Sequence, residues 1–105
     1  MKLITKDIQN KLDKAGWNGT KAVCKFFGGG ACTWIIFGQD PDEKDYLFGV
    51  VDLGMGCVEA GSISLSELQS VRFPPFGLPI ERDMYFNHEG EDMSFFLQKD
   101  SLSGV

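Results

Sequence analysis

The sequence lacks the long apolar segments of a membrane or exported protein. Its longest uninterrupted apolar run is Trp34-Ile35-Ile36-Phe37, whereas a membrane-spanning helix needs about 20 such residues. The first seven residues, Met1 to Asp7, carry charges where a signal peptide needs an apolar stretch. We therefore expect a cytoplasmic protein that makes no contact with a membrane.

Histidine, cysteine and basic residues are also scarce. His88 is the single histidine, and Cys24, Cys32 and Cys57 have none of the short spacings that zinc modules use. An odd number of thiols in a reducing compartment favours buried, reduced side chains. Lys and Arg number 10 and Asp and Glu number 15, so the net charge is −5, which repels a phosphate backbone. The sequence thus predicts no metal, no cofactor and no direct contact with nucleic acid.

A single domain over residues 1–105 fits the length. The hydrophobic content of 43% and charged content of 24% are ordinary for a globular protein. By size scaling, roughly two-thirds of the unfolded surface can be buried. We expect residues 100–105 to form a frayed tail.

Two helices are expected. Residues 5–16 have Thr5 as N-cap and Gly16 as the stop, with an apolar stripe at helical spacing. The second helix begins with Ser64-Leu65-Ser66-Glu67, the pattern of a capping box in which Ser64 and Glu67 bind each other's amides. It must end near Arg72, because two prolines follow.

Five runs rich in apolar residues predict strands, at residues 21–27, 31–38, 46–53, 57–63 and 80–86. The glycine-containing segments 28–30 and 54–56 predict turns, since neither has the residues of a phosphate or dinucleotide loop. Residues 93–99 are read as a closing strand, although a helix also fits. The expected fold is α+β: an antiparallel meander sheet of about five or six strands with two helices. A partly closed barrel is the alternative.

The run at residues 80–86 holds candidate binding side chains. In a strand, Arg82 lies in the apolar stripe, whereas Glu81, Asp83 and Tyr85 share the other face. A guanidinium in an apolar stripe must be paired. It forms either a structural ion pair with Glu67, Glu59 or Asp52, or an anion-binding site. Glu81 and Asp83 have a separation usable for acid–base work, or they belong to a solvated strand face.

Trp34 is the other candidate. With a two-residue turn in the first hairpin, Trp34 would lie opposite Lys25, on a face that is only half apolar. It is either plain core or the anchor of a protein interface. The predicted strands 31–38 and 46–53 are apolar on both sides, and only two short helices are expected to cover them. Uncovered apolar surface of this kind predicts a homo-oligomer, with a dimer favoured.

Five blocks of sequence occur in a recognisable order: Lys25-Phe26-Phe27, Thr33-Trp34, Leu47–Val51, Ser64–Leu68 and Gly77–Phe86. In these blocks, over about residues 3–86, the chain resembles a family of small bacterial proteins of uncharacterised function. Members are often encoded on plasmids, gene cassettes and other mobile genetic elements. The resemblance implies a mobile-element accessory role and carries no enzyme activity, cofactor or catalytic residue.

Three functions are considered. The preferred one is a non-enzymatic binding or interaction module acting as a homo-oligomer, with no catalytic residue. The second is a small hydrolase or anionic-ligand-binding protein with a pocket near the proline-rich loop, where Arg82 holds the anion and Glu81, Asp83 or Tyr85 moves protons. The third is an acidic antagonist of a host DNA-binding protein, which needs a clustered negative face.

Overall fold

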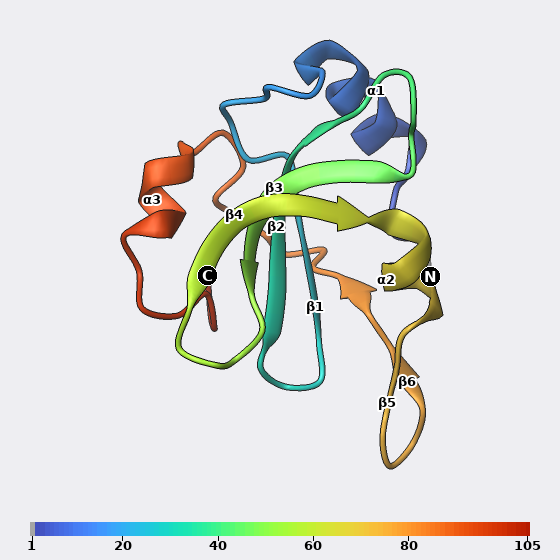
Figure 1. The fold of residues 1–105 in the computed structure, drawn as a ribbon, viewed down its shortest axis with the longest axis vertical. Coiled ribbons are helices and arrows are strands. Elements are labelled where there is room, and N and C mark those ends of the chain that lie inside the picture. The colour runs from blue at the N-terminus through green and yellow to red at the C-terminus, as the bar shows by residue number, and fades with distance from the viewer. Residues whose placement is uncertain (1) are drawn as a thin grey trace.

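The computed structural model describes residues 2–105 and shows an open antiparallel sheet with helices around it (Figure 1). The strand order is β4-β3-β2-β1-β7, and β5 and β6 form a separate hairpin. The α+β class is confirmed, and the sheet does not close into a barrel. The elements in chain order are α1 (Lys6–Ala15), β1 (Cys24–Gly28), β2 (Cys32–Gln39), β3 (Tyr46–Asp52), β4 (Val58–Ser64), α2 (Leu65–Ser70), β5 (Arg72–Phe73), β6 (Leu78–Pro79), β7 (Glu81–Arg82) and α3 (Met93–Leu97).

Helix α1 begins and ends where its caps predict. The Thr5 hydroxyl accepts a hydrogen bond from the Ile8 amide at 3.2 Å. Gly16 has a φ of 66° and donates its amide to the Leu12 carbonyl at 3.0 Å, a positive φ that glycine adopts without steric cost. Because Ile8 and Leu12 lie one turn apart, both are buried on the side of the helix that faces the sheet.

Helix α2 is capped differently from the prediction. The Ser64 hydroxyl accepts from the Glu67 amide at 3.3 Å, as expected. Asp45, however, supplies the second acceptor: its carboxylate binds the Ser66 amide and the Ser64 hydroxyl, each at 2.8 Å. These hydrogen bonds lower the pKa of Asp45, the Ser64 contribution being the largest. The loop that precedes β3 therefore holds the start of α2.

One face of the sheet packs against α1 and α2. Trp34 lies on this face and is only 7% exposed. The first hairpin has a turn over residues 29–31, so Trp34 pairs with Phe26 and not with Lys25, as a two-residue turn would require. This longer turn places the indole among apolar side chains. The buried cluster is Leu3, Ile8, Leu12, Cys24, Phe26, Trp34, Ile36, Leu47, Ile63, Leu68 and Ile80.

The opposite face is covered by the C-terminal segment, which differs from the prediction in two ways. Residues 93–97 form helix α3 rather than a closing strand, and Phe96 packs edge-on against Phe37 with ring centroids 5.7 Å apart. Residues 100–105 are not frayed: Leu102 is buried, and its amide donates to Asp52 at 2.8 Å. The buried cluster on this face is Ala22, Ile35, Phe37, Val50, Phe96 and Leu102.

With this segment in place, both apolar faces of the sheet are covered, whereas the sequence predicts that two short helices leave part of them exposed. Strands β2 and β3 are protected on one side by α1 and α2 and on the other by α3 and the segment that follows it. The expectation of uncovered sheet faces was therefore wrong, whereas self-association itself stays a prediction.

The predicted strand at residues 80–86 is short in the structure. Only Glu81 and Arg82 pair, with Phe27 and Phe26 of β1. The chain then turns, because the Asp83 carboxylate accepts from the Tyr85 amide at 2.8 Å, a local hydrogen bond that competes with strand pairing. The meander thus holds for β1 to β4, and β7 adds to the other edge of β1.

Candidate functional site

Two neighbouring hollows run along α1 and share Lys11, Val23 and Glu89. The Lys11 ammonium lies 2.8 Å from the Glu89 carboxylate, and this ion pair belongs to the wall of both. The first, the amino-end hollow, holds about 300 Å³ beside the first turn of α1 and residues 82–86. The second, the carboxyl-end hollow, holds about 430 Å³ between the last turns of α1, residues 18–23 and Gly90.

Arg82 and Asp83 both line the amino-end hollow. The Arg82 guanidinium donates to the backbone carbonyl of Lys2. Asp83 lies 3.4 Å from the ammonium of Lys25, a largely buried side chain that also donates to the Val105 carbonyl at 2.6 Å. Asp83 thus pairs with a lysine that holds the C-terminal segment.

Two of the carboxylates expected as partners of Arg82, Asp52 and Glu59, have other partners. Asp52 accepts from the amides of Leu102 and Gly54 and from the hydroxyl of Ser101. The bond from Leu102 is the main reason why the pKa of Asp52 is lowered. Glu59 accepts from the Cys57 thiol at 3.5 Å. Of the three acids considered, Asp52 does not pair with Arg82, because it anchors the C-terminal segment on the opposite face.

The two hollows differ in charge balance. The amino-end hollow carries two cations, Lys11 and Arg82, against three acids. The carboxyl-end hollow carries three cations against one acid, Glu89. Because Lys14 has no acidic partner among residues 2–105, the carboxyl-end hollow offers an anion one uncompensated ammonium group. The acids of the amino-end hollow are Asp7, Asp83 and Glu89.

The other predicted residues do not join Arg82 and Asp83. Glu81 lines a separate hollow with Arg72, because neighbouring residues of a strand point to opposite sides. Tyr85 is 92% exposed on the turn after β7. Trp34 belongs to the core and borders a shallow hollow beside α2. The structure therefore does not bring Glu81, Tyr85 and Trp34 into one site with Arg82.

The thiols lack the environment of a nucleophile. Burial raises the pKa of Cys24 to about 12. Desolvation raises the pKa of Cys32, and the hydrogen bond with Glu59 raises that of Cys57. All three are free thiols. Within residues 2–105, no group of three or more His, Cys, Asp or Glu side chains could hold a metal ion.

The residues of the carboxyl-end hollow were missed in the sequence. Lys11 and Lys14 are three residues apart, a spacing that places two side chains on neighbouring turns of a helix. This spacing was the available signal. It could not show that Lys21 and Glu89, from distant parts of the chain, lie beside them.

Two exposed features could meet another molecule. The β5–β6 hairpin projects from the body of the protein, and its tip residue Phe76 is 82% exposed (Figure 1). Strand β4 forms one edge of the sheet. In the part of the chain that the structure describes, no helix is long and apolar enough to cross a membrane.

The fold and these hollows define a small α+β domain with an open sheet and a mixed-charge groove along its first helix. The chain belongs to the DUF2958 family, described as "Protein of unknown function (DUF2958)", whose model matches residues 2–105. The comparisons with curated proteins and with solved structures gave no match.

Proposed function

We propose that this protein is a non-enzymatic interaction module of a bacterial mobile element that acts as a homodimer, with β4 as the self-pairing edge. The observation that carries the proposal is the unpaired outer side of this strand. Strand β4 pairs with β3 over seven positions, from Val58 to Ser64. Among residues 2–105, no other strand pairs with it.

The composition of β4 leaves this edge open to another strand. Edge strands are usually protected by proline, lysine or a bulge. The strand reads VEAGSIS, with Glu59 as its one charged residue. Its pairing with β3 is continuous, without a register shift. Gly61, in the middle of the strand, carries no side chain that could hinder a neighbouring strand.

Antiparallel pairing of two β4 strands around Gly61 is electrostatically acceptable. A two-fold axis at this residue sets Ala60 opposite Ser62 and Glu59 opposite Ile63 of the second copy, so the two Glu59 carboxylates do not face each other. The two five-stranded sheets would then join into one. A contact of this kind uses the same strand on both subunits, as a two-fold dimer requires.

The test is the molecular mass in solution, measured by light scattering across micromolar concentrations. We expect a dimer, and we expect Ala60→Lys to weaken it because the two new ammonium groups would be diagonal neighbours across the axis. Met55→Lys adds the same charge on the exposed turn before β4 and serves as the control. A strict monomer, or equal dissociation of both variants, would contradict the proposal.

A second candidate function is binding of a small anionic ligand in the amino-end hollow. The observation in its favour is that Arg82 lines this hollow, which has a volume of about 300 Å³. Its excess of acids weighs against this ligand class. We expect Arg82→Ala to abolish any such binding. The circular dichroism spectrum and unfolding midpoint of this variant should match those of the parent protein. Unchanged binding in a folded variant would remove the basis for this function.

A further inference from the structure

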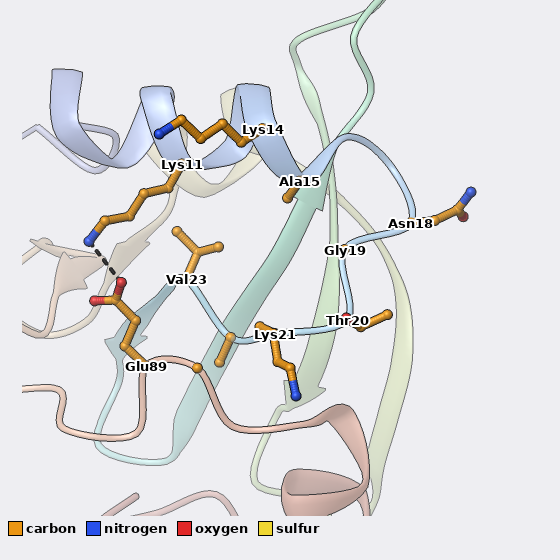
Figure 2. Close-up of a pocket in the computed structure, with 11 residues that line it drawn as sticks. Lys11, Lys14, Ala15, Asn18, Gly19, Thr20, Lys21, Val23 and Glu89 are labelled. Atoms are coloured by element: carbon orange, nitrogen blue, oxygen red, sulfur yellow. Dashed lines mark ion pairs between the residues drawn. The ribbon is translucent and has the colours of Figure 1, made fainter.

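We propose that the carboxyl-end hollow binds a small molecule with an apolar ring system and one carboxylate, and that this carboxylate competes with Glu89 for Lys11. The ligand site is separate from the β4 edge and goes beyond the proposed dimer. Figure 2 shows Lys11 reaching from α1 toward Glu89 at one end of the hollow, with Val23 directed toward the helix between them. The hollow, of about 430 Å³, is within the size range of small-molecule sites.

The walls of the hollow are held by the fold. A side chain at Gly19 would lie 2.0 Å from the carbonyl oxygen of Phe37, so this loop is packed directly on strand β2. On the other side, the Ala22 amide donates to the Glu91 carbonyl at 2.9 Å, and the Gly90 amide donates to the Ala22 carbonyl at 2.8 Å. A ligand therefore meets a preformed open hollow and orders little backbone on binding.

The floor is apolar. Ala15, Ala22 and Val23 line it, and Figure 2 shows Ala15 on the side of α1 that faces the strands. The methylene stem of Lys11 adds apolar surface along the helix. These groups offer apolar surface to an aromatic or alicyclic ring, while Asn18, Thr20 and the charged side chains line the rest of the hollow.

The rim carries three lysines, two of which are paired with acids. Lys14 forms no ion pair with any of residues 2–105. Lys21 is paired with Asp92 at 2.7 Å, an exposed contact that costs little to rearrange. Lys11 is held by Glu89 at 2.8 Å and Asp7 at 3.3 Å. A ligand carboxylate would meet the ammonium group of Lys14, and it would compete with Glu89 for that of Lys11.

The helix dipole opposes an anion here, because α1 ends at Ala15 and its carbonyl end is negative. This opposition reduces affinity by no more than about fivefold at an exposed terminus and is screened by salt. Lys14 lies in the last turn and already offsets it. The ammonium groups therefore determine the preferred charge of the ligand.

The test uses 2-naphthoate and its neutral counterpart 2-naphthamide as probes, titrated into the isotope-labelled full chain and followed by amide NMR shifts. For a probe of this size we expect a dissociation constant on the order of 1 mM for the carboxylate. The shifted amides should be those of the hollow, including Gly19, Val23 and Gly90. Binding of 2-naphthamide should be at least about twofold weaker, because it lacks the charge.

Three variants make the test specific. We expect Lys14→Gln to weaken naphthoate binding by about two- to fivefold, the usual range of an exposed charge pair. Glu89→Gln should instead strengthen binding by a similar factor, because it frees Lys11 from its competitor. Lys6→Gln is the control, since Lys6 lies on the same helix and lines neither hollow; its affinity should be unchanged.

The proposal is overturned if naphthoate causes no shift, if the shifts lie outside the hollow, or if naphthamide binds equally well. It is also overturned if Glu89→Gln weakens binding in a variant whose amide spectrum is otherwise native. Failure of the β4 dimer would leave the result intact, because the hollow is built within one chain. The two proposals therefore fail independently.

Discussion

The two faces of the sheet are covered by different kinds of structure. One face is covered by α1 and α2, whose first turns are capped by Thr5 and Ser64, with Asp45 from the loop before β3 as a further acceptor at α2. The other face is covered by α3 and the C-terminal segment, which polar contacts from distant strands hold in place. The C-terminal cover therefore depends on a few hydrogen bonds between residues far apart in the chain. We expect substitutions and acid to open this cover before the one formed by α1 and α2.

The largest expected effect comes from removing the ring that fills the second face. Phe96 is fully buried and contacts Phe37 and Phe95. We expect Phe96→Ala to lower the free energy of unfolding by about 3–5 kcal/mol, because it leaves a cavity. Urea unfolding measures this change. Phe76→Ala at the exposed hairpin tip is the control and should stay within about 0.5 kcal/mol of the parent.

The next effect tests the polar anchor itself. Asp52→Ala leaves the buried Leu102 amide without its acceptor, so we expect a loss of about 1–3 kcal/mol. Hydrogen exchange should quicken at Leu102 more than at Leu12, which is buried on the other face. Equal acceleration at both residues would show that the two faces unfold together and would remove the distinction.

A pH titration should show the same difference without a substitution. Hydrogen bonds, first that from Leu102, lower the pKa of Asp52 in the folded protein. A lowered folded pKa contributes stability at pH values above the unfolded pKa of about 3.9, and this stability is lost as the pH falls through the folded pKa. We expect acid to accelerate exchange at Leu102 before Leu12. In Asp52→Asn this selective acid response should disappear.

The smallest effect concerns the first face. Asp45→Ala removes the acceptor of the Ser66 amide at the start of α2, and helix caps are modest contributors to stability. We expect a drop in the thermal midpoint smaller than that of Asp52→Ala. Asp42→Ala is the matched control in the same loop, because its carboxylate holds no helix amide. A larger drop than at Asp52 would reverse the proposed order of the two faces.

Local signals were sufficient for much of the fold. Thr5 and Gly16 marked both ends of α1, and Ser64 marked the start of α2. The four strands of the meander lie close to the predicted runs. Helix α3 was missed because Met93, Phe95 and Leu97 alternate as in a strand, whereas Met93, Phe96 and Leu97 also fit a helix. In the helix, Phe96 packs edge-on against Phe37 within the buried cluster of the second face.

The candidate site was harder to foresee. The pattern around Arg82 correctly indicated a side chain that needs partners, but not that a backbone carbonyl from Lys2 would provide one. Strand alternation separated Glu81 from Arg82, and the turn at Asp83 left Tyr85 exposed. The excess of lysines in the carboxyl-end hollow arises from side chains of α1 and of the segment before β1, which only packing brings together.

Composition and short-range pattern were thus enough to establish a compact, acidic α+β chain with two capped helices and a run of hairpin strands. Folding in three dimensions settled which segments cover the sheet, where the charges gather and which edge stays unpaired. The physical reason is the distance along the sequence between the residues that interact. Caps and turns depend on residues a few positions apart, whereas the contacts Leu102–Asp52 and Lys11–Glu89 join residues far apart in the chain and exist only after the sheet has formed.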